Sequence, residues 1–129
     1  MRFLAIILLT LCICTPAAGA DLKVTEMAVT TRLIDGRPVD SVHRISSTPA
    51  RELFCFTRIF GGSAEEHTVI KHIWYKNEKP VAEYELPVKG KRWRASSSHP
   101  VGKGSAGEWR VDAVDSGGSV LKSVKFRMN

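Results

Sequence analysis

Turn-forming residues divide the sequence after residue 20 into short segments, and this spacing constrains the fold more than any other feature. Gly, Pro, Asn and Asp recur between runs that are rich in β-branched and aromatic residues, which is typical of strands. No run shows helical apolar spacing over a useful length. We therefore expect strands, with a further short one at 42–45. The seven main segments are 22–34, 51–60, 67–77, 81–88, 91–97, 108–114 and 119–128.

About seven strands with evenly spaced turns favour an all-β fold, an antiparallel immunoglobulin-like β-sandwich. A small barrel is the alternative. The segment 115–118 (Asp-Ser-Gly-Gly) predicts a hairpin between the last two strands, and residues 98–107 are expected to form a loop. We find no repeat and no linker, so residues 21–129 are expected to form a single domain.

The first twenty residues predict a secretory signal peptide. Arg2 precedes an apolar run, and small residues lead up to Ala20, the expected cleavage position. The run is shorter than the roughly 20 residues that a membrane-spanning helix needs. Cys12 and Cys14 suggest lipid attachment as an alternative, but each follows a large apolar residue. We expect a periplasmic or secreted protein with no transmembrane span in the mature chain.

Only Cys55 remains beyond the predicted signal peptide, so a mature monomer cannot form an internal disulfide. It stands between phenylalanines, which favours a buried apolar side chain over a reactive thiol. The surrounding strand, 51–60, is apolar on both faces, and its inward face stays open. Alternation turns Trp74 and Trp109 inward on two other strands. His72 shares the face of Trp74, so we expect a hydrogen-bonded core histidine.

Positive charge is concentrated in the second half of the sequence. The formal net charge is +6; residues 21–70 carry 6 cations and 7 anions, whereas residues 71–129 carry 12 and 6. An excess of this kind favours anionic partners, or serves solubility alone.

The stretch 89–98 (KGKRWRASSS) is the most basic segment. Alternation places Arg92 and Arg94 on one face and Trp93 on the other. We expect the two arginines to face solvent and to pair across strands with Glu83 and Glu85 of the preceding strand.

Motifs that would carry catalysis or bind cofactors are weak. The segment 102–107 matches G-x-G-x-x-G, but a strand is expected after it, where a dinucleotide site needs a helix. Ser98 and His99 have nucleophile and base residue types without the G-x-S-x-G context. The histidines lack metal-site spacing. We expect no enzyme activity, no metal and no cofactor.

Several elements with fixed spacing resemble a bacterial secreted or membrane-attached family, the domain of unknown function 2914. They are His72-x-Trp74-Tyr75, then LPVKG at 86–90, RWR at 92–94 and GEWRV at 107–111. The resemblance extends over residues 53–126. It implies a compact all-β accessory domain, with Trp74, Trp93 and Trp109 in packing roles. It implies no activity.

Together these observations predict a non-enzymatic binding module that recognises an anionic envelope glycan or lipid. A structural subunit that contacts an envelope protein through a sheet edge is the alternative. Nucleic acid is not expected, because the export signal and the alternating faces argue against it. The candidate ligand-binding residues are Lys89, Lys91, Arg92, Arg94 and Lys103, with Tyr75 and Tyr84 as stacking surfaces.

Overall fold

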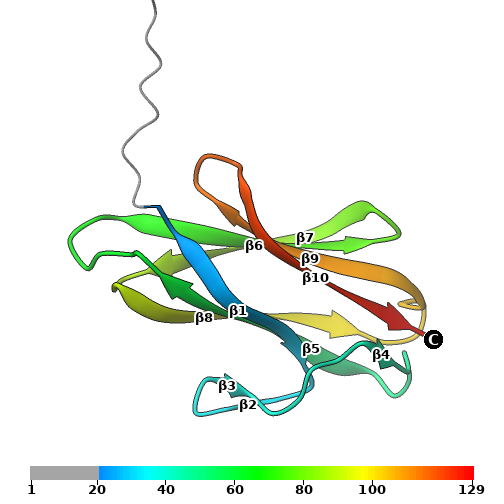
Figure 1. Cartoon of the computed structure of the whole chain (residues 1–129). Coiled ribbons are helices and arrows are strands. Elements are labelled where there is room, and N and C mark those ends of the chain that lie inside the picture. Colours follow the sequence, from blue (N-terminus) through cyan, green and yellow to red (C-terminus); the bar gives the residue numbers. More distant parts are fainter. Residues whose placement is uncertain (1–20) are drawn as a thin grey trace, which may run out of the picture.

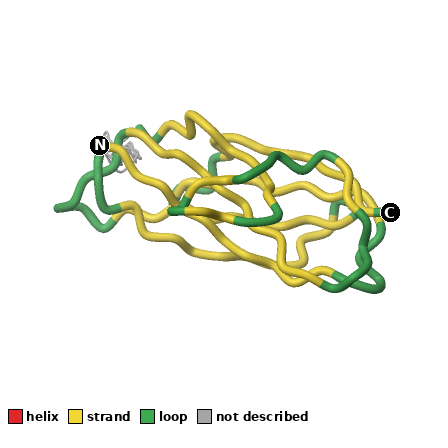
Figure 2. Tube along the Cα trace, turned by 90° about the horizontal axis from the view of Figure 1, so that it is seen from below, coloured by secondary structure: helices red, strands yellow, loops and turns green. Residues whose placement is uncertain are grey.

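The computed structural model describes residues 21–129, so the predicted signal peptide lies outside the described residues. Every regular element of this part is a strand (Figure 2). The long strands are β1 (Lys23–Thr30), β5 (Arg51–Phe60), β6 (Thr68–Lys76), β7 (Lys79–Val88), β8 (Arg92–Val101), β9 (Gly107–Asp115) and β10 (Val120–Met128). The short strands are β2 (Leu33–Ile34), β3 (Arg37–Pro38) and β4 (Arg44–Ile45).

The long strands form the two layers of a β-sandwich (Figure 1). One sheet has the order β1-β5-β8, the other β4-β10-β9-β6-β7, and β2 pairs with β3 in a separate hairpin. All pairings are antiparallel except that of β4 with β10. The seven long strands confirm the predicted sandwich.

Aromatic side chains fill the space between the sheets. Trp74 meets Trp109 edge to face, with ring centres 6.5 Å apart, and Phe126 at 6.3 Å. Such contacts add to the burial of their large apolar area. Trp74, Trp109 and Cys55 are buried in the core, whereas Trp93 is half-buried and packs against it. Burial raises the pKa of the Cys55 thiol, which keeps it protonated.

Strand β5 carries buried apolar residues on both faces, although its outer face is covered only in part. Leu53, Cys55 and Ile59 point into the sandwich core, which places Phe56 on the outer face, yet Phe56 is fully buried. The β2–β3 hairpin crosses this face: Arg94 Nη1 donates a hydrogen bond to the carbonyl of Asp35, in the hairpin turn, at 3.2 Å.

The expected strand 22–34 was wrong at its end, because β1 stops at Thr30. Asp40 explains the break. Its two carboxylate oxygens accept hydrogen bonds from the hydroxyls of Thr30 and Thr31, each at 2.6 Å. Partial burial works against ionisation of Asp40, but these hydrogen bonds outweigh it and lower its pKa. The chain therefore leaves the sheet and enters the hairpin.

The expected loop 98–107 was also wrong over its first part. Strand β8 continues to Val101, because β5 begins at Arg51 and the two strands pair from Arg51–Val101 to Phe60–Arg92 without a break. The proline in this strand is tolerated because β8 is an edge strand. The loop is therefore confined to residues 102–106.

Candidate functional site

Four arginines gather on the outer face of the three-stranded sheet. Arg58 of β5 stands directly opposite Arg94 of β8, and Arg92 lies two residues along the same face. Arg37 of the β2–β3 hairpin completes the group. These four side chains line a shallow hollow of about 300 Å³, with Trp93 as the fifth lining residue. We call the four the arginine hollow.

Like charges that face each other across a strand pair are destabilising, and their Cβ atoms are typically about 5 Å apart. Little in the described part of the chain offsets this. Arg58 has one ion pair, 3.5 Å from Glu26, between half-exposed side chains. Such pairs contribute little. Arg94 reaches only the carbonyl of Asp35. The hollow therefore keeps a concentrated positive charge.

The expected pairing of the arginines with Glu83 and Glu85 was wrong. Those glutamates belong to β7, which lies in the other sheet. Glu83 forms an ion pair of 3.3 Å with Lys71, and Glu85 stands opposite the same lysine. Sequence alternation gives faces correctly but does not say which strands become neighbours, and β7 and β8 are consecutive without being paired.

The candidate lysines are only partly gathered at the hollow. Lys89 and Lys91 lie in the connection that leads into β8, and Lys91 Nζ is 5.5 Å from the centre of the Phe60 ring. Phe60 helps to line a second hollow, beside Arg58 and Arg92. Lys103 follows the far end of β8, so the structure does not bring it to the arginines.

The two candidate tyrosines lie elsewhere. Tyr84 is half-buried and packs against the core, and its hydroxyl is 2.8 Å from His99 Nδ1. Burial, and then the negative charge of Glu52, raise its pKa. Tyr75 lies on the outer face of the five-stranded sheet under the guanidinium of Arg110, 4.2 Å from the ring centre. Neither tyrosine joins the hollow.

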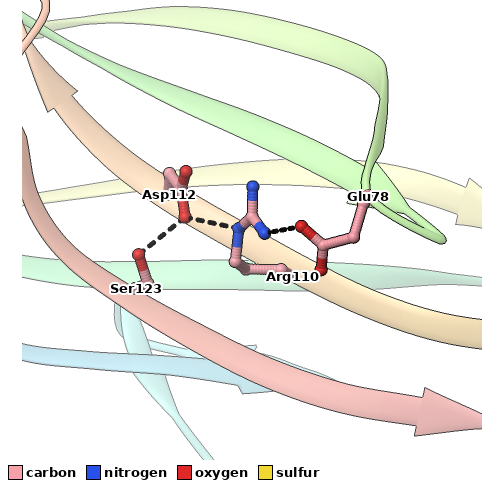
Figure 3. Close-up of polar contacts among 4 residues, drawn as sticks. All are labelled: Glu78, Arg110, Asp112 and Ser123. Carbon is pink, nitrogen blue, oxygen red and sulfur yellow. Dashed lines mark hydrogen bonds and ion pairs between the residues drawn. The ribbon is translucent and has the colours of Figure 1, made fainter.

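Arg110, in contrast, is neutralised by two neighbouring carboxylates (Figure 3). It binds Asp112, with Nε 3.0 Å from Oδ1, and Glu78, which lies in the β6–β7 turn. Ser123 Oγ donates to the same Asp112 oxygen at 2.6 Å. The hydrogen bond that Arg110 donates to Glu78, more than the other influences, raises the pKa of Arg110. This cluster satisfies its own charges, unlike the arginine hollow.

A chain of hydrogen bonds crosses the core. Trp74 Nε1 donates to Ser97 Oγ at 3.1 Å, and Ser97 Oγ lies 2.8 Å from His72 Nδ1. Thr57 Oγ1 donates to the carbonyl of Ala95 at 2.9 Å and lies 3.0 Å from His72 Nε2. Each hydroxyl has one proton, so Ser97 donates to Nδ1 and the imidazole is protonated at Nε2. The predicted core histidine is confirmed, and burial lowers its pKa to about 4.

Ser98 and His99 point to opposite faces of β8, since they are adjacent residues of one strand. The His99 ring packs between Trp74, at 5.3 Å, and Trp109, at 5.8 Å, and burial lowers its pKa. The segment 102–107 leads into strand β9. Within residues 21–129 no group of three metal-ligating side chains lies close enough to hold an ion.

Residues 67–128 match the family described as "Protein of unknown function (DUF2914)". This segment belongs to that family. The match starts after the stretch 53–66, which the sequence resemblance had included. It spans β6 to β10 and contains Arg92 and Arg94, whereas Arg37 and Arg58 lie outside it. No curated protein sequence matches the chain significantly.

Among solved structures, the chain is similar to the crystal structure of an immunoglobulin-like protein from Pseudomonas aeruginosa, with a TM-score of 0.59. The two sequences are 10% identical, and the similarity covers 87% of this chain and 99% of the other. At this identity the likeness shows the immunoglobulin-like fold alone. In residues 21–129 no helix is long and apolar enough to cross a membrane.

Proposed function

We propose that this protein is a non-enzymatic binding module of the cell envelope that holds an anionic ligand in the arginine hollow. The observation that supports this most is the position of Arg58 directly opposite Arg94, with Arg92 and Arg37 beside them. Four guanidinium groups with one weak ion pair destabilise a small domain slightly. An anion that bridges them would offset this repulsion.

Arginine suits this role better than lysine, because its planar fork binds carboxylate or phosphate through two parallel hydrogen bonds. Residues on two strands and a hairpin converge on one hollow, which favours a ligand with several anionic groups. An acidic glycan, an anionic lipid and an acidic protein segment share that chemistry. Charge-driven binding of any of them should weaken with ionic strength.

The test is binding of the purified protein to vesicles that contain phosphatidylglycerol, and to polygalacturonate, at low and high ionic strength. The double variant Arg92→Ala/Arg94→Ala is compared with Lys122→Ala/Lys125→Ala, which removes the same charge from β10. We expect binding at low ionic strength that the arginine variant weakens roughly tenfold or more and the lysine variant leaves nearly unchanged. Equal losses in both variants would contradict a specific site.

A periplasmic or secreted location is part of the proposal. It rests on the short apolar run followed by small residues that ends at Ala20. The full chain, expressed in a Gram-negative host, should be recovered from the periplasm or the medium with Asp21 as its first residue. Amino-terminal sequencing checks this, and an uncleaved chain that stays in the cytoplasm would refute it.

A further inference from the structure

We propose that the free edge of β8 takes up an extended acidic segment of a partner protein as an added strand. The acidic side chains of that segment would lie beside Arg92 and Arg94. This inference rests on the proposed function, because it assigns the anionic groups of the ligand to a protein segment. It adds a second source of binding energy, which is the hydrogen bonding of the backbone.

Strand β8 ends its sheet and is paired only with β5. The backbone N–H of Gly61 donates to the carbonyl of Lys91 at 2.8 Å, so the peptide groups of Lys91 face β5. In an antiparallel ladder, hydrogen-bonded and non-hydrogen-bonded pairs alternate, and the pairing of β5 with β8 has no bulge. The N–H and C=O groups that face the open edge therefore belong to Arg92, Arg94, Ser96 and Ser98.

Pro100 agrees with this assignment. It falls on the same alternate positions, so an N–H there would face the open edge. The pairing with β5 therefore loses no hydrogen bond to this proline. Residues 92–98 then form an edge with no proline in it. An unpaired edge of this kind is a template for strand addition.

The other sheet edges of residues 21–129 are less available. At β1, the N–H of Val42 already donates to the carbonyl of Val29 at 2.7 Å. At β10, strand β4 covers the end of the edge. Strand β7 has a proline near each of its ends, and Glu83 and Glu85 on its outer face would repel an acidic segment. Among the strands of residues 21–129, β8 combines an open edge with the arginine hollow.

The positive charge beside the β8 edge favours an acidic segment as the added strand. A strand added to β8 places every second side chain on the outer face, with Cβ atoms about 5 Å from those of Arg92 and Arg94. Glutamate or aspartate there would reach the guanidinium groups, and the intervening side chains would turn toward the half-buried Trp93. A second copy of β8 would bring arginines instead of carboxylates to this face, so the arginines disfavour self-pairing while they attract an acidic strand.

The experiment measures binding of a short capped peptide of alternating glutamate and valine to the purified full-length protein. A second peptide has the same sequence but is N-methylated on alternate residues, which keeps the charge and removes the backbone donors. Two versions place the N-methyl groups on the odd or on the even residues. On the protein, Ser96→Pro removes an edge-facing N–H, and Ser96→Ala is its control.

We expect the parent peptide to bind, and one N-methylated version to bind roughly tenfold or more weakly than the other. Ser96→Pro should weaken binding similarly, with circular dichroism and unfolding checked against Ser96→Ala. If Ser96→Pro fails to fold, the pair of N-methylated peptides still decides the question.

Each alternative outcome separates this inference from the proposed function. If parent and both methylated peptides bind equally, and Arg92→Ala/Arg94→Ala abolishes binding, the anion site stands and strand addition is refuted. If vesicles or polygalacturonate bind while the peptide does not, the protein-segment ligand is refuted and a glycan or lipid takes its place. If no anionic probe binds, both proposals fail.

Discussion

The indole N–H of Trp74 donates to Ser97 Oγ at 3.1 Å and thereby joins β6 of one sheet to β8 of the other. Ser97 Oγ in turn forms a hydrogen bond with His72 Nδ1. Within residues 21–129 no buried side-chain nitrogen or oxygen lacks a hydrogen-bond partner. The interior polar groups are thus fully paired, and removing one of them should leave others unsatisfied.

Ser97→Ala should destabilise the fold by about 3 kcal/mol, because it leaves Trp74 Nε1 and His72 Nδ1 without partners in a buried site. The free energy of unfolding in urea measures this. The control is Ser96→Ala, an exposed position of the same strand, which should change stability by less than about 0.5 kcal/mol. Equal effects of the two substitutions would mean that the chain of hydrogen bonds contributes nothing.

Stability should decrease as the pH falls from about 6.5 to about 4. Burial lowers the pKa of His72 from 6.5 to about 4 in the folded state. As the pH falls, the unfolded state therefore takes up the proton before the folded state does, and acid stabilises the unfolded state. The loss should reach about 3 kcal/mol at the bottom of this range. His99, whose pKa is also lowered by burial, acts in the same direction.

Nitrogen NMR of the imidazoles separates the two histidines. We expect His72 to stay neutral with its proton on Nε2 down to about pH 5, since its folded pKa is about 4. A midpoint near 6.5 for His72, or a proton on Nδ1, would contradict both the burial argument and the direction of the hydrogen bonds.

Arg92→Glu should raise the free energy of unfolding slightly, by about 0.5 kcal/mol at low ionic strength, while anion binding is lost. The reason is that a carboxylate beside Arg94 and diagonal to Arg58 relieves the repulsion in the hollow. The gain should vanish in high salt. Lys103→Glu, in the loop beyond β8, is the control and should leave both quantities nearly unchanged. A stability loss in Arg92→Glu would mean that the arginines are not in repulsion.

Gly62→Ala should destabilise the protein by about 2 kcal/mol or more. A Cβ atom at this position would lie 2.4 Å from the carbonyl oxygen of Gly90 and 2.5 Å from Val88 Cγ1, so backbone would have to move. Gly117→Ala is the control, because its Cβ would come no closer than 3.4 Å to Asp115. Thermal unfolding of the two variants, measured side by side, decides this prediction, and similar midpoints would refute it.

Sequence alternation predicted the inward faces of β6 and β9 well, because one side of each strand packs in the core. Trp74 and Trp109 were placed in the core on this basis, and both are buried there. Alternation failed on β5, since Phe56 on its outer face is buried as fully as Leu53 and Cys55 on its inner face. A strand with buried apolar residues on both faces has no regular alternation from which the inward face can be predicted.

Half of the arginine hollow could be read from the sequence and half could not. Arg92 and Arg94 were visible as alternate residues of one strand. Arg58 and Arg37 were missed, because they come from distant segments and their position depends on which strand pairs with β8. Arg58, which lies in the mostly apolar stretch 53–60, was the one available signal, and its role follows only from the pairing of β5 with β8.

The pairing of β8 also decides which fragments of this protein can be studied. The family match begins at residue 67, but the strand partner of β8 is β5, which ends at Phe60. A fragment cut at the limits of the match would hold β8 without its pairing partner β5, and Ser97, the acceptor for Trp74, would lie on an unpaired strand. The matched segment and the smallest unit with complete sheets therefore differ, and laboratory truncations should retain residues 21–66.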